Sequence, residues 1–315
     1  MKGASFLLWS LTVLTLSCHQ PDMKFRLTEV TPLDSIPGAS GLGINEQYIM
    51  VIGDNSPHLY LLDHTAKPSG IINIYPTDDF KDGKIKKSLK PDFEALEMIK
   101  GETHDEVLIF GSGSRGPQRD VFIHVILAPE PIVKTFDLVA FYDHLREMDE
   151  MSGYELNIEA VALHENQLLL FNRGKNLIFS FDYLSFLGFI NDGIPYPHPV
   201  VTEVVLPQLN GFVSGFSGAT MIPGTSTLLF TTSVEDTPNA YDDGEILGSF
   251  IGMVDLSRSG QPIRYFLIEE DNQPYKVKIE SIAILNQMSK NELEVLMVTD
   301  SDGDKSLLLK GILTW

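Results

Sequence analysis

The stretch Phe216-Ser217-Gly218-Ala219-Thr220-Met221 decides the fold, because the chain repeats its pattern five times. Each copy opens with an apolar residue, continues with Ser or Glu and then a small residue, and goes on with alternating apolar positions. The second positions of the five copies are Ser40, Glu94, Glu159, Ser217 and Glu280. They recur at intervals of about 54 to 65 residues, a period typical of stacked structural repeats that each contain several strands.

Each copy is followed by a second apolar run and a polar loop, so that each repeat reads as a group of short strands. The fifth group, at residues 279–285, 293–299 and 306–313, lacks a fourth strand, whereas residues 25–31 form a strand outside any group. The four complete groups are predicted at residues 40–45, 48–53, 58–63 and 70–75; 94–99, 106–110, 120–127 and 131–138; 158–164, 167–172, 176–182 and 200–206; and 217–222, 227–232, 249–255 and 262–268.

A ring of blades closes when the strand at 25–31 supplies the missing outer strand of the last group, because closure leaves no unpaired gap between the first and last blades. We therefore predict an all-β protein: a five-bladed β-propeller of four-stranded blades, closed by the N-terminal strand joining the last blade. Residues 25–315 form its single domain.

The composition restricts the classes of partner. A hydrophobic share of 43% with 21% charged residues excludes a disordered chain. The formal net charge of −20 disfavours binding to nucleic acid, because such a surface repels phosphate backbones. We expect a monomer that binds a small anionic substrate or a surface ligand.

The N-terminus reads as a targeting segment. Lys2 and the apolar stretch at residues 6–16 are typical of a signal peptide, which we place at residues 1–17. The only cysteine, Cys18, follows directly, as in a bacterial lipobox, so we predict that Cys18 is lipidated and that residues 18–24 form a tether. The alternative is an ordinary signal peptide with an incidental cysteine. With Cys18 lipidated, the protein would be exported to the bacterial periplasm, outer membrane or cell surface, and it would contact a membrane only through this lipid anchor.

The antiparallel order within a blade predicts where the polar residues meet. The link that enters each inner strand lies on the same face as the link between the second and third strands. The five Ser and Glu positions should therefore surround one end of the central axis, together with the polar loops. The longer insertions at 76–92, 139–157, 233–248 and 269–278 fall on that face, with a short helix expected within 140–150, whereas 183–199 falls on the opposite face.

Three carboxylates that converge on one axis repel each other unless they protonate, disperse or share a cation. Oxygen donors without sulfur or imidazole suit a hard ion, and Ca²⁺ accepts many oxygens in flexible geometry. We therefore predict a Ca²⁺ site with ligands from Ser40, Glu94, Glu159, Ser217 and Glu280. The alternative is that these side chains cap strand ends and bind only water.

The segment FSGATMIPGTSTLLFTTSVED at residues 216–236 resembles the fourth-blade segment of the calcium-activated nucleotidases, the apyrase family. Met253-Val254-Asp255 and Lys278-Ile279-Glu280-Ser281 follow at similar offsets. The resemblance implies a five-bladed propeller with one central Ca²⁺, held by the five Ser and Glu positions. It also implies Ca²⁺-dependent hydrolysis of nucleoside di- and triphosphates.

The loops that would bind substrate depart from this family. The family has paired Asp followed by Arg in its first loop, where this chain has Asp54-Asn55-Ser56, and two adjacent Arg in its third, where this chain has Arg173-Gly174-Lys175. We predict Asp54 and Arg173 as catalytic residues, for orienting water and holding phosphate charge. The predicted substrate-binding residues are Arg115, Asn172, Lys175, Glu235 and Asp236.

Two functions follow as hypotheses. One is an exported Ca²⁺-dependent phosphoanhydride or phosphoester hydrolase. The other is a non-enzymatic surface propeller with structural calcium that binds a glycan, peptide or protein partner. The loops distinguish them, because a phosphohydrolase needs basic side chains beside the metal.

Overall fold

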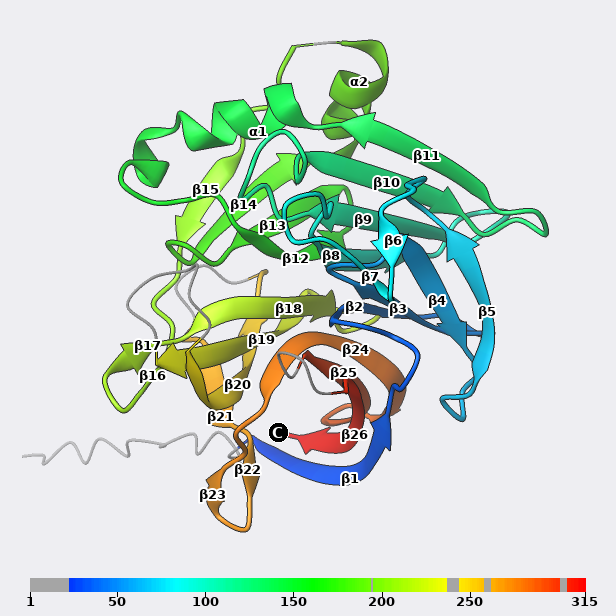
Figure 1. The fold of residues 1–315 in the computed structure, drawn as a ribbon. Helices are drawn as coiled ribbons and strands as arrows, with labels where there is room; N and C mark the ends of the chain where they lie inside the picture. Colours follow the sequence, from blue (N-terminus) through cyan, green and yellow to red (C-terminus); the bar gives the residue numbers. More distant parts are fainter. Residues whose placement is uncertain (1–22, 194, 237–243, 258–261, 301–304) are drawn as a thin grey trace, which may run out of the picture.

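The computed structural model describes residues 23–193, 195–236, 244–257, 262–300 and 305–315, and it is nearly all β, with 55% strand and 8% helix. Five four-stranded antiparallel sheets are arranged around one axis (Figure 1). Each innermost strand contacts the innermost strands of the two neighbouring blades, and the last contacts the first. The predicted five-bladed propeller is confirmed.

The blades follow the chain in order, and each runs from the axis to the rim. Blade 1 comprises β2 (Ala39–Ile44), β3 (Ile49–Gly53), β4 (His58–Leu62) and β5 (Pro68–Asn73). Blade 2 comprises β8 (Phe93–Ile99), β9 (Glu106–Gly111), β10 (Val121–Ile126) and β11 (Ile132–Asp137). Blade 3 comprises β12 (Ile158–His164), β13 (Gln167–Asn172), β14 (Leu177–Asp182) and β15 (Val200–Glu203). Blade 4 comprises β18 (Gly215–Met221), β19 (Thr227–Asp236), β20 (Glu245–Asp255) and β21 (Arg264–Leu267). Blade 5 comprises β24 (Lys278–Ser289), β25 (Glu292–Asp300) and β26 (Leu307–Thr314).

The N-terminal strand closes the ring. β1 (Lys24–Pro32) pairs antiparallel with β26, from Lys24 opposite Thr314 to Pro32 opposite Leu307. Met23, just before β1, is buried in the core between blades 4 and 5. The predicted closure is therefore confirmed, although the strand already begins at Lys24, at the end of the predicted tether. The signal peptide at 1–17 and Cys18 lie outside the described residues.

The core lies between the blades. The second strands, such as β3 and β9, are buried along nearly their whole length, because each blade is packed between two others. Strands covered on both faces read as continuous apolar runs, which is why these strands were easy to predict. The outermost strands, such as β5 and β11, have mostly exposed residues.

Two helices fill the rim beside blades 2 and 3 (Figure 1). α1 (Val139–Arg146) confirms the expected helix after blade 2, and a 3-10 turn (Asp149–Met151) follows it. α2 (Tyr183–Asp192) was not predicted; the sequence indicated only a long insertion at 183–199, which contains prolines at 195, 197 and 199. Those prolines follow the helix, which the Asp182 side chain caps by accepting a hydrogen bond from Ser185 N at 2.7 Å. Phe141 of α1 packs on Phe186 of α2 at 5.1 Å between ring centroids.

Other connections form short hairpins: β6 (Phe80–Lys81) with β7 (Lys84–Ile85), β16 (Gln208–Leu209) with β17 (Phe212–Val213), and β22 (Glu269–Glu270) with β23 (Gln273–Pro274). The insertion predicted at 233–248 is in part a continuation of the sheet, because β19 runs through Asp236 and β20 begins at Glu245. Within the described ranges, no helix has the length and apolarity needed to span a membrane.

Candidate functional site at the end of the central axis

All five inner strands share a backbone irregularity at the Ser or Glu position. The pairing register between the first and second strands shifts at Ser40, Glu94, Glu159, Ser217 and Glu280. An extra residue at this point is a β-bulge, which leaves the bulged residue out of the ladder and redirects its side chain. The repeated phrase therefore encodes a repeated bulge, and the five side chains start from equivalent positions around the axis.

The residues two positions before the glutamates also belong to this site. Asn157 Nδ2 donates a hydrogen bond to Glu159 Oε1 at 2.6 Å, and Lys278 Nζ lies 3.0 Å from Glu280 Oε1. Asp92 stands in the same position before Glu94. Our sequence reasoning did not identify these residues, although the polar side chain two positions before each Glu was a visible signal.

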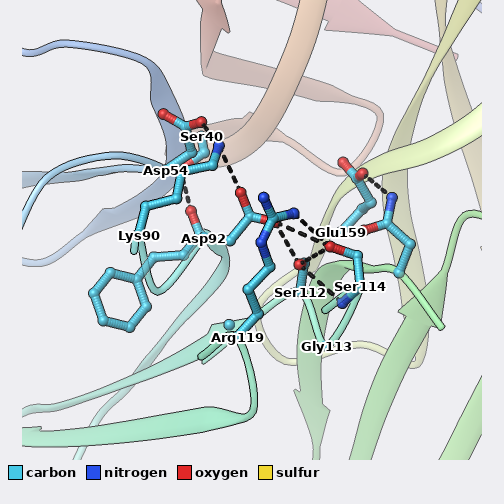
Figure 2. A network of polar contacts seen from close by, with 12 residues as sticks. Ser40, Asp54, Lys90, Asp92, Ser112, Gly113, Ser114, Arg119 and Glu159 are labelled. Carbon is cyan, nitrogen blue, oxygen red and sulfur yellow. Dashed lines mark hydrogen bonds and ion pairs between the residues drawn. The ribbon is translucent and has the colours of Figure 1, made fainter. Parts of the chain in front are cut away.

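A first charged network joins blades 1 and 2 (Figure 2). Lys90 Nζ forms ion pairs with Asp54 Oδ2 and, at 2.6 Å, with Asp92 Oδ1. Arg119 forms an ion pair with Asp92 Oδ2, which also accepts a hydrogen bond from Ser112 Oγ at 2.5 Å. Lys90 and Arg119 are absent from our sequence predictions, because nothing in the pattern indicates which loop side chains turn toward the axis.

Glu94 completes a cluster of three carboxylates. Oxygen atoms of Asp54, Asp92 and Glu94 lie within 4.8 Å of one another, and among the described residues Glu94 takes part in no hydrogen bond or ion pair. Asp54 Oδ1 is buried without a hydrogen-bond partner. Burial and the nearby carboxylates of Asp92 and Glu159 hold the pKa of Glu94 well above its ordinary value. Burial also raises the pKa of Asp54, against the opposing effect of Lys90.

A second network joins blades 3, 4 and 5. Arg173 lies 2.6 Å from Glu235 Oε1 through Nη2 and 3.6 Å from Glu159 Oε2 through Nη1. Lys278 Nζ lies 3.4 Å from the same Glu235 oxygen. Burial opposes ionisation of Glu235, but Arg173 and Lys278 outweigh it and lower the pKa of this carboxyl. Burial raises the pKa of Glu280 to about 8, reinforced by Glu159 and opposed by Lys278.

The protein therefore supplies positive charge of its own to the carboxylates. The two networks combine the acids Asp54, Asp92, Glu94, Glu159, Glu235 and Glu280 with the bases Lys90, Arg119, Arg173 and Lys278. Six acids stand against four bases, and the raised pKa values of Glu94 and Glu280 reduce the negative charge that this excess carries. The predicted Ca²⁺ site remains a prediction.

The two serines of the ring bind neighbouring backbone and side-chain groups. Ser40 Oγ donates a hydrogen bond to the carbonyl oxygen of Phe93 in blade 2 at 2.5 Å. Ser217 Oγ donates one to Thr231 Oγ1 in its own blade at 3.1 Å. Both serines are buried. Their hydroxyl protons are used in these two hydrogen bonds.

The predicted catalytic and substrate-binding residues lie in different parts of this face. Asp54, Arg173 and Glu235 join the networks described above. Asn172 supports the site indirectly, because its Oδ1 accepts a hydrogen bond from Asn157 N at 2.6 Å. Lys175 instead donates to the carbonyl oxygen of Glu150 at 2.9 Å. Two further predicted residues, Arg115 and Asp236, are exposed.

Comparison with solved structures shows low overall similarity. The glutaminyl cyclase of Myxococcus xanthus is 13% identical, with a TM-score of 0.42 over 92% of this chain and 96% of that chain. An exo-1,5-alpha-L-arabinanase from a bovine ruminal metagenomic library is 8% identical, with a TM-score of 0.48 over 89% of this chain and 94% of that chain. At this level neither similarity carries an argument about function.

Among curated proteins, none matches the sequence. The resemblance to calcium-activated nucleotidases is thus carried only by the residues quoted for it. A family model matches residues 35–313, which is nearly the whole propeller. The chain belongs to this family, which is described as a family of unknown function (DUF6929).

Proposed function

We propose that this protein is a Ca²⁺-dependent propeller that binds a small phosphate ester or anhydride at the end of its central axis and hydrolyses it. The supporting observation is the cluster of Asp54, Asp92 and Glu94, whose carboxylate oxygens lie within 4.8 Å of one another. An all-oxygen donor set with two carboxylates in excess of its lysine suits a hard divalent cation.

The donor atoms fit such an ion. Glu94 has no protein partner among the described residues, and Asp54 Oδ1 is buried without one. These two side chains would hold the cation, with Asp92 beside them. The remaining ring residues, Glu159, Glu280, Ser40 and Ser217, would supply further oxygen ligands as the nucleotidase resemblance implies. A bound Ca²⁺ would polarise a phosphoryl oxygen and lower the pKa of a bound water.

The other residues of the site would position the substrate. Arg173 and Lys278 are the basic side chains of the second network, and both would hold negative charge on the phosphoryl group. Asp54 would accept a hydrogen bond from the attacking water. Arg173 Nη1 is buried without a hydrogen bond and lies 3.6 Å from Glu159 Oε2, so a phosphoryl oxygen would contact it in place of this carboxylate.

A second function is supported by the same networks. The basic side chains Lys90, Arg119, Arg173 and Lys278 are all ion-paired and only 11–19% exposed. A substrate phosphate would have to displace existing carboxylate partners. In this alternative, the ion is structural and the loops around the axis bind a glycan, peptide or protein partner without catalysis.

The proposed location follows from the N-terminus. We propose export by the signal peptide at 1–17 and lipidation at Cys18, with a tether that ends where β1 begins at Lys24. The net charge of −20 argues against a nucleic-acid partner.

Phosphate release distinguishes the two functions. A panel of nucleotides and phosphoesters is incubated with the wild type, Glu94→Gln and Arg173→Ala, each with Ca²⁺ and with chelator. We expect Ca²⁺-dependent release by the wild type only, while a Lys175→Ala control, which lies outside both networks, keeps activity. Calcium binding without release from any member of the panel would reject the hydrolase and leave the binding function.

A further inference from the structure

We propose that the Lys90 ammonium is a tethered counter-ion that occupies the divalent-cation position of the Asp54, Asp92 and Glu94 cluster and must leave when a cation binds. This inference rests on the proposed calcium function and adds the feature that sets its affinity. It makes the cluster a site with two alternative occupants, one of which is part of the chain.

The position of Lys90 carries the argument. Its Nζ forms ion pairs with Asp54 and with Asp92, two of the three clustered carboxylates, and lies 2.6 Å from Asp92 Oδ1. Ca²⁺ binds oxygen at about 2.3–2.6 Å. A cation shared by these carboxylates would thus need the space in which the ammonium lies. Two positive charges at such close range also repel strongly, since the lysine side chain is only 11% exposed.

The neighbouring residues make Lys90 replaceable without loss of the cluster. Asp92 Oδ2 is held independently by Arg119 and by the hydroxyl groups of Ser112 and Ser114 (Figure 2). Asp92 therefore remains in place when its Oδ1 changes partner. Lys90 itself lies outside regular secondary structure, between β7 and β8, on a flexible four-carbon stem.

Two consequences follow. Without a divalent cation, the ammonium offsets part of the negative charge, so the propeller folds without metal. With a divalent cation, binding must overcome the ion pairs of Lys90, so the wild type binds more weakly than the same cluster without the lysine. Arg119 does not compete in this way, because its ion pair is with Asp92 Oδ2 and not with the Oδ1 that Lys90 contacts.

Calorimetric titration of the full chain with Ca²⁺ tests the proposal. Lys90→Met keeps the length and the apolar stem but removes the charge. We expect its Kd for Ca²⁺ to be at least about tenfold lower than that of the wild type, which corresponds to about 1.4 kcal/mol. The matched control is Lys310→Met, which removes the same charge from a lysine that lies outside both networks and pairs with Glu294 at 3.0 Å. Its Kd should change by a much smaller factor.

A second variant covers the case in which Lys90→Met does not fold without metal. Lys90→Met combined with Asp54→Asn removes one charge of each sign, so it should fold in chelator and lose the gain in affinity.

The outcomes separate the two proposals. Equal Kd values for the wild type and Lys90→Met would overturn the role of Lys90 and leave the calcium function standing. Calcium uptake by Lys90→Met alone would support the role of Lys90 and remove calcium from the function of the wild type. No uptake by any variant would overturn both.

Discussion

Arg173 should be the ion-pair residue whose loss most destabilises the propeller, because it joins Glu159 of blade 3 to Glu235 of blade 4. The three side chains are 15%, 10% and 12% exposed, so the network is buried. Removing one partner of a buried pair costs about 3–5 kcal/mol, since it leaves an uncompensated charge. Glu235 keeps Lys278 at 3.4 Å, which favours the lower end of this range. We therefore expect Arg173→Met to lose about 3 kcal/mol of unfolding free energy at pH 7.5.

The pH dependence of this loss identifies its cause. Burial opposes ionisation of Glu235, but Arg173 and Lys278 together outweigh burial and lower the pKa of this carboxyl in the folded protein. A carboxyl with a lowered folded pKa contributes stability above its unfolded pKa and loses it as the pH falls. The difference between the wild type and Arg173→Met should therefore shrink as the pH falls below 4.5, the ordinary value of a glutamate, and through the lowered pKa of Glu235.

Urea unfolding followed by circular dichroism measures both quantities. The control is Lys175→Met, two residues away, whose lysine lies 3.7 Å from the 64% exposed Glu203. An exposed pair contributes at most about 1 kcal/mol. If Arg173→Met and Lys175→Met cost the same at pH 7.5, the buried network contributes no special stability and the reasoning is wrong.

Three other predictions concern the anchor, the closure and a buried carboxyl. Cys18→Ala should release the protein from membrane fractions, and unchanged partitioning on fractionation would reject the anchor. Deleting residues 19–32 removes β1 and exposes the edge of β26, so the melting temperature should fall sharply; a deletion as stable as the parent would refute closure by this strand. Burial raises the pKa of Glu97 to about 8, so folding takes up a proton and stability falls as pH rises from about 4.5 to 8. Glu97→Gln should abolish this fall in a pH series of urea titrations, and an unchanged profile would mean that Glu97 ionises normally.

The fold could be predicted well from the sequence because the same strand pattern occurs in each of the five repeats. Apolar runs, polar loops and the small residue after each Ser or Glu recur in all five repeats, so an error in one repeat is corrected by the others. The missing strand of the fifth repeat and the extra strand at 25–31 were enough to predict closure. α2 was missed because it occurs in one repeat only, so no other repeat indicated a helix at this place.

The site was predicted in part. The ring of Ser and Glu was visible because it belongs to the repeat, and the structure adds that each position is a bulge. Lys90 and Arg119 were not visible, because they come from loops whose paths differ between repeats and depend on tertiary packing. Lys278 could have been found, since it precedes Glu280 by two positions as Asn157 precedes Glu159.

The thermal melting of the full chain in chelator and in excess Ca²⁺, for the wild type and Glu94→Gln, tests the central claim most directly. A ligand that binds only the folded state at 100 times its Kd stabilises it by about 2.7 kcal/mol, so the wild type should melt several degrees higher with Ca²⁺. Mg²⁺ should do less, because it requires stricter octahedral geometry. The pKa of Glu94 is raised by burial, so Gln should be tolerated in chelator while the calcium shift is lost. Wild-type melting curves that superimpose in chelator and in saturating Ca²⁺ would contradict the calcium site and the function built on it.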